Sequence, residues 1–148
     1  MRSLRLFEEF VEDRVVRKKT SDINRAKSLA EEAKKRNKFI LELVSKIGIK
    51  DSNANYFIEN AYDALIELLR AKLLVDGYYS SGEGAHEAEV SYMRDLGFAE
   101  REVRFMNDLR YYRNGILYYG KDFDTEYAEK VVEFLRKAYP KMMKILGK

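Results

Sequence analysis

The chain has 148 residues, of which 46% are hydrophobic and 36% are charged, so it is long enough to bury a core and too apolar to remain disordered. It contains no cysteine, one proline and eight glycines, which excludes disulfides and thiolate metal sites and provides too few turn-forming residues for an all-β protein. The net charge is +3, but residues 1–50 hold 14 Lys or Arg against 8 acidic residues, and residues 51–148 hold 14 against 17. Such a basic segment favours contact with nucleic acid or nucleotide phosphates, although a solvated helix face has the same composition.

No apolar run reaches the roughly 18 residues that a membrane span requires. The first ten residues carry acidic side chains and lack the apolar region of a secretory signal. We therefore expect a cytoplasmic protein that makes no contact with a membrane.

Apolar residues at helical spacing predict three helices in the first half of the chain. The first covers residues 3–18 and the second covers 23–46, after the capping residues Thr20, Ser21 and Asp22 and before Gly48. The third runs from Ala54 to about residue 76 and is the most apolar segment, which predicts that it is the central helix.

The second half of the chain also reads as helical. Residues 77–87 contain three Gly and two Ser, which predicts a loop, and a short helix is expected over 84–95. Two further helices are predicted, over 99–118 and from Asp122 or Asp124 to about residue 146, the latter containing Pro140. With no competing strand pattern, the sequence predicts an all-α fold, an antiparallel bundle of five to six helices that forms a single domain over residues 1–148.

The segment LRYYRNGILYYG, residues 109–120, contains the strongest candidate site. Arg110, Arg113 and Asn114 lie on nearly one side of a helix, and Tyr118, four residues after Asn114, is predicted to fall on that side too. A bidentate guanidinium with an amide and a phenol can hold a phosphate, and Lys72 could reach the same site from the end of the third helix. The alternative is that these are polar residues where a buried helix reaches the surface, with the tyrosines packed as amphipathic side chains.

Other catalytic and cofactor signals are weak. His86 is the only histidine, and a metal site would need more ligands than it supplies, so polar surface or a local hydrogen-bonding role is the simpler interpretation. The sequence has no phosphate-binding loop, dinucleotide fingerprint, zinc motif or EF-hand. We expect neither a metal nor a cofactor.

Most of the chain resembles the HEPN superfamily, which comprises small all-helical domains. The likeness extends from AKSLAEEAKKR near residues 26–36, through ENAYDALIELLRAKLL, to LRYYRNGILYYG and the final helix. The family signature is an Arg, often followed by a polar residue such as Asn, and then a His after four to six positions. Arg113 and Asn114 match this signature, whereas Tyr118 stands where the His is most often expected.

The resemblance implies a function as well as a fold. In the family, an Arg and a His from two protomers cleave RNA without a metal: the Arg stabilises the phosphate transition state and the His positions or activates the 2′-hydroxyl. A phenol with a pKa near 10 is a poor base at neutral pH, although Tyr118 can donate a hydrogen bond to a phosphate oxygen. The resemblance therefore implies the fold and a phosphate-facing groove more strongly than it implies nuclease activity.

We accordingly expect an HEPN-like homodimer that binds nucleotide or RNA through this groove. One alternative is a metal-independent ribonuclease toxin that uses Arg113, Asn114 and either Tyr118 or His86; the other is a non-catalytic helical scaffold. Because family members are commonly encoded beside a small nucleotidyltransferase as toxin–antitoxin pairs, such an enzyme is the expected partner protein. An Arg113 locked against a carboxylate of its own chain would argue against the groove.

Overall fold

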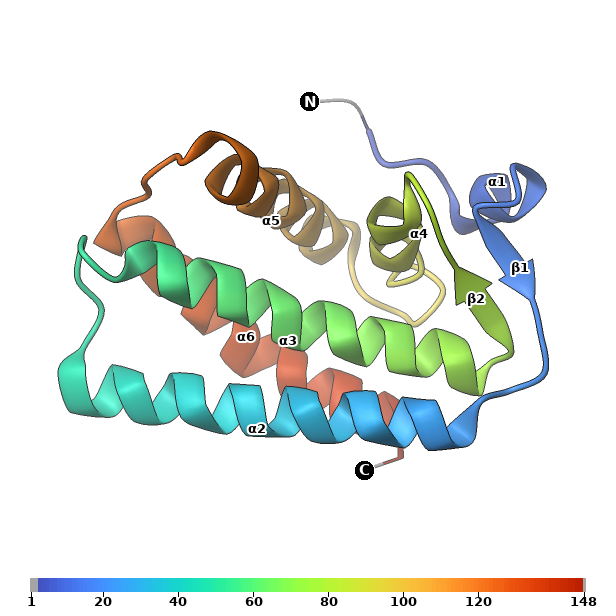
Figure 1. The fold of residues 1–148 in the computed structure, drawn as a ribbon, viewed down its shortest axis with the longest axis horizontal. Coiled ribbons are helices and arrows are strands. Elements are labelled where there is room, and N and C mark those ends of the chain that lie inside the picture. Colours follow the sequence, from blue (N-terminus) through green and yellow to red (C-terminus); the bar gives the residue numbers. More distant parts are fainter. Residues whose placement is uncertain (1–2, 148) are drawn as a thin grey trace.

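The computed structural model describes residues 3–147, which form a helical bundle with one small β-ribbon (Figure 1). The elements, in chain order, are α1 (Phe7–Glu12), β1 (Val16–Lys18), α2 (Ile23–Ile47), α3 (Ala54–Val75), β2 (Tyr78–Ser80), α4 (Ala85–Ser91), α5 (Glu100–Tyr119) and α6 (Thr125–Ile145). The predicted all-α helical fold is confirmed.

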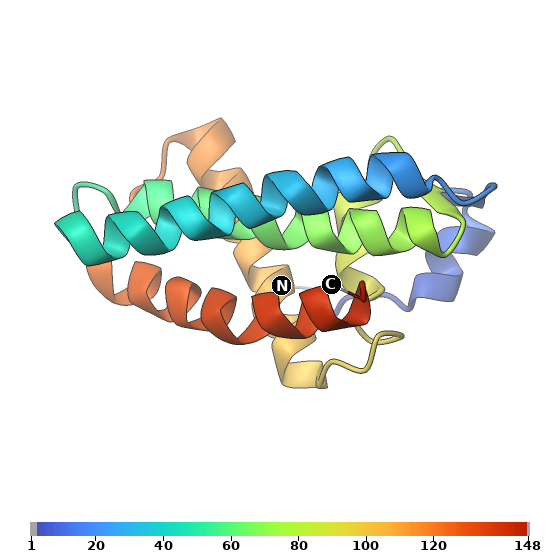
Figure 2. The same ribbon diagram turned by 90° about the horizontal axis from the view of Figure 1, so that it is seen from below.

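Helix α3 is the centre of the core, as its apolar sequence predicts. Thirteen of its 22 residues are buried, and it contacts α2, α4, α5 and α6. Figures 1 and 2 show α2 and α3 antiparallel along the length of the molecule, with α6 packed alongside them and α5 crossing α3 steeply. Because α3 is covered on several sides, side chains that it turns toward α4 and α5 are held in fixed positions.

Capping residues determine where the long helices begin and end. Asp22 accepts a hydrogen bond from the backbone N–H of Arg25 at 3.1 Å, and Asp124 accepts one from that of Tyr127 at 2.9 Å, so both carboxylates satisfy N–H groups that lack a partner in the first turn. Gly48 follows the last residue of α2 with φ of 72°, a left-handed conformation that favours glycine.

The prediction of one helix over residues 3–18 is wrong. Helix α1 covers only Phe7–Glu12; Arg14 then takes φ of 62°, and residues 16–18 form strand β1. Strand β1 pairs antiparallel with β2 in a register that places Val16 opposite Ser80, so part of the expected 77–87 loop is also a strand. The β-branched pair at 15 and 16 favours an extended chain once a partner strand lies beside it, and that partner is about 60 residues away in the sequence.

One smaller difference concerns helix length. Helix α4 ends at Ser91 and is followed by turns, whereas the sequence predicts a helix to residue 95. Helix α6 continues through Pro140 to Ile145. Within the part of the chain that the structure describes, no helix combines the length and apolar character that crossing a bilayer demands.

A buried carboxylate joins three elements on one side of α3. Glu89 of α4 is 1% exposed and accepts hydrogen bonds from Nε and Nη2 of Arg70 on α3, at 2.7 and 3.0 Å. It also accepts one from the hydroxyl of Ser80 on β2, at 3.0 Å. Since a buried charge is tolerated only when it is paired and hydrogen-bonded, these contacts fix α4 and the ribbon against α3.

We predict that Arg70→Met lowers the free energy of unfolding by about 3–5 kcal/mol, because it leaves the Glu89 carboxylate buried without its cation. The double variant Arg70→Met/Glu89→Leu should recover most of that loss, since no unpaired charge remains. Denaturant titration measures both. The control is Lys130→Met on the exposed face of α6, which should change stability by at most about 0.5 kcal/mol. An Arg70→Met variant as stable as this control would contradict the prediction.

Candidate functional site

Arg113 faces inward from α5 and is paired within its own chain. Its Nη2 donates a hydrogen bond to Oδ1 of Asp63 on α3 at 3.0 Å, and its guanidinium carbon lies 5.5 Å from the ring centroid of the buried Tyr62. The Arg113 side chain is 19% exposed, and its Nε is buried without a hydrogen-bond partner among the described residues. This intrachain pair is the arrangement that argues against a freely available Arg113, so any anion at this position competes with Asp63.

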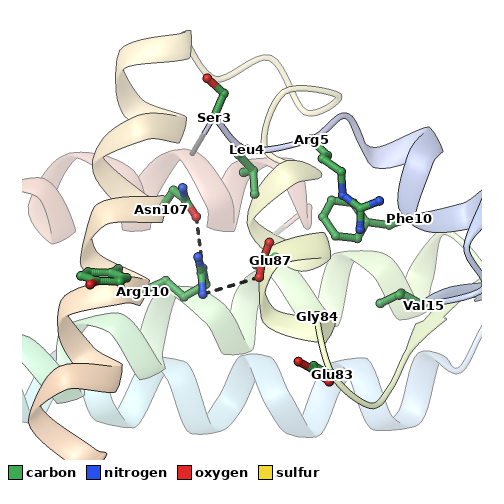
Figure 3. Close-up of a pocket in the computed structure, with 11 residues that line it drawn as sticks. Ser3, Leu4, Arg5, Phe10, Val15, Glu83, Gly84, Glu87, Asn107 and Arg110 are labelled. Atoms are coloured by element: carbon green, nitrogen blue, oxygen red, sulfur yellow. Dashed lines mark hydrogen bonds and ion pairs between the residues drawn. The ribbon is translucent and has the colours of Figure 1, made fainter. Parts of the chain in front are cut away.

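Arg110 lies one turn earlier on α5 and is less engaged. Its Nε donates to Oδ1 of Asn107 at 3.1 Å, and its Nη1 lies 4.0 Å from Oε1 of Glu87, which exceeds hydrogen-bonding distance. The Arg110 side chain is 15% exposed and borders a cavity of about 610 Å³ between α4, α5 and the N-terminal segment (Figure 3). Arg110 therefore keeps hydrogen-bond donors for a molecule in this cavity.

The N-terminal segment forms the far wall of the cavity. Arg94 donates hydrogen bonds to the backbone oxygens of Leu4 and Arg5 at 2.9 and 2.8 Å and also pairs with Glu100. Arg5 itself stacks over Phe10 at 4.4 Å and pairs with an acidic residue outside the cavity lining. These contacts hold residues 4 and 5 in place, so the N-terminal segment closes one side of the cavity.

The other predicted site residues do not all gather around Arg113. Tyr118 is 73% exposed and lies five residues after Arg113, which places it on a different side of α5. Asn114 is partly buried, and its side chain has no hydrogen bond to another described residue. Lys72 pairs with Asp76 at 3.0 Å. It lies nine residues beyond Asp63 on α3, roughly 14 Å along the axis, so it does not reach the guanidinium of Arg113.

His86 is the group that the structure places close to the arginines. Its Nδ1 lies 3.0 Å from the hydroxyl of Tyr62, and the two rings stack with centroids 6.1 Å apart. Tyr62 thus lies between Arg113 and His86. The sequence shows a single histidine, which marks His86 as unusual. Tyr62 and Asp63 fall within a predicted apolar helix, and their spacing does not predict contacts with residues 24 and 50 positions away.

Burial and neighbouring charges shape the electrostatics of this cluster. Burial lowers the pKa of His86, an effect that Glu89 opposes and that Arg70, Arg113 and Arg110 reinforce. Burial raises the pKa of the Tyr62 phenol far above its ordinary value, so this hydroxyl stays protonated. The pKa of Glu59 is also raised, mainly by burial, with Arg113 acting in the opposite direction. The site therefore combines cations with a neutral phenol, an imidazole and nearby carboxylates.

Comparisons with protein-family models, with curated proteins and with solved structures found no match. Within residues 3–147, no group of three or more His, Cys, Asp or Glu side chains is arranged to hold a metal ion. The described side chains offer guanidinium N–H donors and a small cavity lined in part by polar groups.

We predict that the folded protein loses stability as the pH falls through about 6.5, the ordinary pKa of His86. The unfolded chain binds the proton below that pH, whereas the folded chain resists protonation until a lower pH, so the loss levels off below the folded-state pKa. His86→Asn should reduce this dependence. Denaturant midpoints at pH 7.5 and 5.5 measure it, and equal pH dependence in the variant and the wild type would refute the prediction.

Proposed function

We propose that this protein is an HEPN-like homodimer that binds RNA or a nucleotide along α5, with Arg110 and Arg113 contacting the ligand. The observation that carries the proposal is the largely buried guanidinium of Arg110 at a cavity of about 610 Å³, with the guanidinium of Arg113 one turn further along α5. An arginine has five N–H donors, and each of these two makes one hydrogen bond to another described residue. Surplus donors in a partly dehydrated position suit a phosphate group.

Charge balance limits how strongly such a site can bind. Asp63 lies against Arg113, and Glu59 is close enough for the charge of Arg113 to oppose the rise in its pKa. A phosphate oxygen would replace one carboxylate oxygen in the hydrogen-bonding shell of Arg113, so part of the gain is offset by the lost ion pair. We therefore propose moderate, salt-sensitive affinity rather than tight binding.

Exposed apolar side chains near the end of α5 support the dimer. Of the large hydrophobic residues that are exposed in the described chain, four belong to this helix: Tyr111, Leu117, Tyr118 and Tyr119. A two-fold interface repeats one patch on both subunits, so this end of α5 would face its own copy. Two copies each of Arg110 and Arg113 would then lie near one subunit interface, and this concentration of positive charge suits a polyanion.

Binding without turnover is the better-supported form of the proposal. The exposed Tyr118 lies on a different side of α5 from Arg113, and a phenol is a poor base at neutral pH. A metal-independent ribonuclease is the second candidate, and the contact of His86 with Tyr62, beside Arg113, favours it. From the family resemblance we also propose a toxin–antitoxin or nucleotidyltransferase-associated role, with the nucleotidyltransferase as partner protein.

We predict that Arg113→Ala weakens binding of a uridine pentaribonucleotide roughly tenfold to hundredfold, because a hydrogen bond to a charged group is worth about 1.5–3 kcal/mol. Asp63→Asn should strengthen binding by freeing the guanidinium. Fluorescence anisotropy at low salt measures both. The control is Arg136→Ala, which removes the same charge from an exposed position on α6 and should change affinity little.

The same mixtures discriminate between the alternatives when a chelator is present. If the wild type cleaves the RNA and Arg113→Ala does not, the result would favour the ribonuclease. Absence of wild-type binding, or equal losses in Arg113→Ala and Arg136→Ala, would refute the proposed groove and leave the helical scaffold.

We predict that the double variant Leu117→Lys/Tyr118→Lys is monomeric, whereas the wild type sediments at twice the chain mass, because two charges at the centre of the interface cannot be buried without partners. Phe39→Lys is the matched control, since Phe39 is 52% exposed on α2, away from the proposed interface. A wild-type monomer, or a dimer that survives the double substitution, would show that α5 is not the interface.

A further inference from the structure

The cavity beside Arg110 carries hydrogen-bonding groups on the side formed by α4 and α5. Arg110 and Glu87 face it from one side, and Val15 and Arg5 line the other, where the Arg5 guanidinium covers the buried ring of Phe10 (Figure 3). Its volume of about 610 Å³ is within the range of sites that take small organic ligands. Such a cavity suits a small ring with hydrogen-bonding groups along one edge.

The wall formed by α4 and α5 presents hydrogen-bond donors and an acceptor side by side. Nη1 of Arg110 and Oε1 of Glu87 are 4.0 Å apart, so neither atom satisfies the other with a direct hydrogen bond. Asn107 is 7% exposed and accepts from Nε of Arg110, which orients the guanidinium and leaves its outer N–H groups toward the cavity. The Glu87 side chain is 41% exposed, and its carboxylate is accessible.

We infer that this cavity binds a guanine base. Arginine donates to the O6 and N7 acceptors of guanine, and a carboxylate accepts from amino and ring N–H groups. Guanine carries its O6 acceptor beside the N1–H and N2–H donors on one edge, which matches Arg110 next to Glu87. Adenine presents an unprotonated ring nitrogen at the position of N1–H, so it would set a lone pair against the carboxylate of Glu87.

This inference rests on the proposed function and names the nucleotide that the binding module selects. Arg113 lies three residues beyond Arg110, about 4.5 Å further along α5, so a phosphate attached to the bound nucleoside can lie near it. Arg113 then provides affinity for any nucleotide, whereas Glu87 and Arg110 provide selectivity for guanine.

The test compares the pentaribonucleotides UUGUU, UUIUU, UUAUU and UUUUU, labelled at one end, by fluorescence anisotropy. Wild type should bind UUGUU about 5- to 150-fold more tightly than UUAUU, the range expected for one bidentate base contact. Inosine lacks the N2 amino group, so UUIUU should fall between them. Glu87→Gln should abolish the preference, and Glu12→Gln, which removes the same charge from an exposed position outside the cavity, should retain it.

The outcomes separate this inference from the proposed function. Equal wild-type affinity for all four oligonucleotides, with binding still weakened by Arg113→Ala, would overturn guanine selection and leave the binding module intact. A preference that survives Glu87→Gln would also overturn it. No binding of any oligonucleotide would remove the proposed function and the inference together. The comparison of UUGUU with UUIUU uses wild-type protein alone, so it tests guanine selection even if a variant does not fold.

Discussion

The buried carboxylate of Glu89 is the constraint on which the candidate site depends. Its hydrogen bonds from Arg70 and Ser80 hold α4 and β2 against the central helix α3. Helix α4 carries His86 and Glu87 one turn or less before Glu89, so their positions relative to α5 follow from this anchor. A short helix of seven residues has little intrinsic stability, and a buried ion pair with three hydrogen bonds supplies the specificity that its own backbone cannot.

Arg110 and Arg113 of α5 have different neighbours. Arg113 is balanced by Asp63 and stacked near Tyr62, which stabilises the folded chain, whereas Arg110 is held by Asn107 and only loosely approached by Glu87. A ligand at Arg113 has to compete with Asp63, whereas Arg110 keeps hydrogen-bond donors that no carboxylate occupies. The two guanidiniums are therefore not equivalent, although their spacing makes them look so in the sequence.

The sequence was sufficient for the long helices because their apolar periodicity and capping residues are local signals. The prediction of a helix over residues 3–18 is wrong because the partner of β1 is distant in sequence. A short apolar segment also fits a helix and a strand equally well. Within the site, Arg110 and its neighbour Asn107 share a helix face that can be read from spacing. The contact of Arg113 with Asp63 depends on how α5 crosses α3, which no local pattern specifies.

Helix α5 links the proposed ligand site to the proposed interface. Its first half is anchored by buried side chains, Val103, Met106 and Leu109, whereas its last turns expose Leu117, Tyr118 and Tyr119. The arginines lie between these halves, so a ligand that contacts them would lie close to a second subunit packed on the exposed turns. Ligand binding and dimerisation would then be thermodynamically linked, because whatever binds the dimer more tightly than the monomer also stabilises the dimer. Such linkage gives the exposed tyrosines a role that does not require Tyr118 to replace a catalytic histidine.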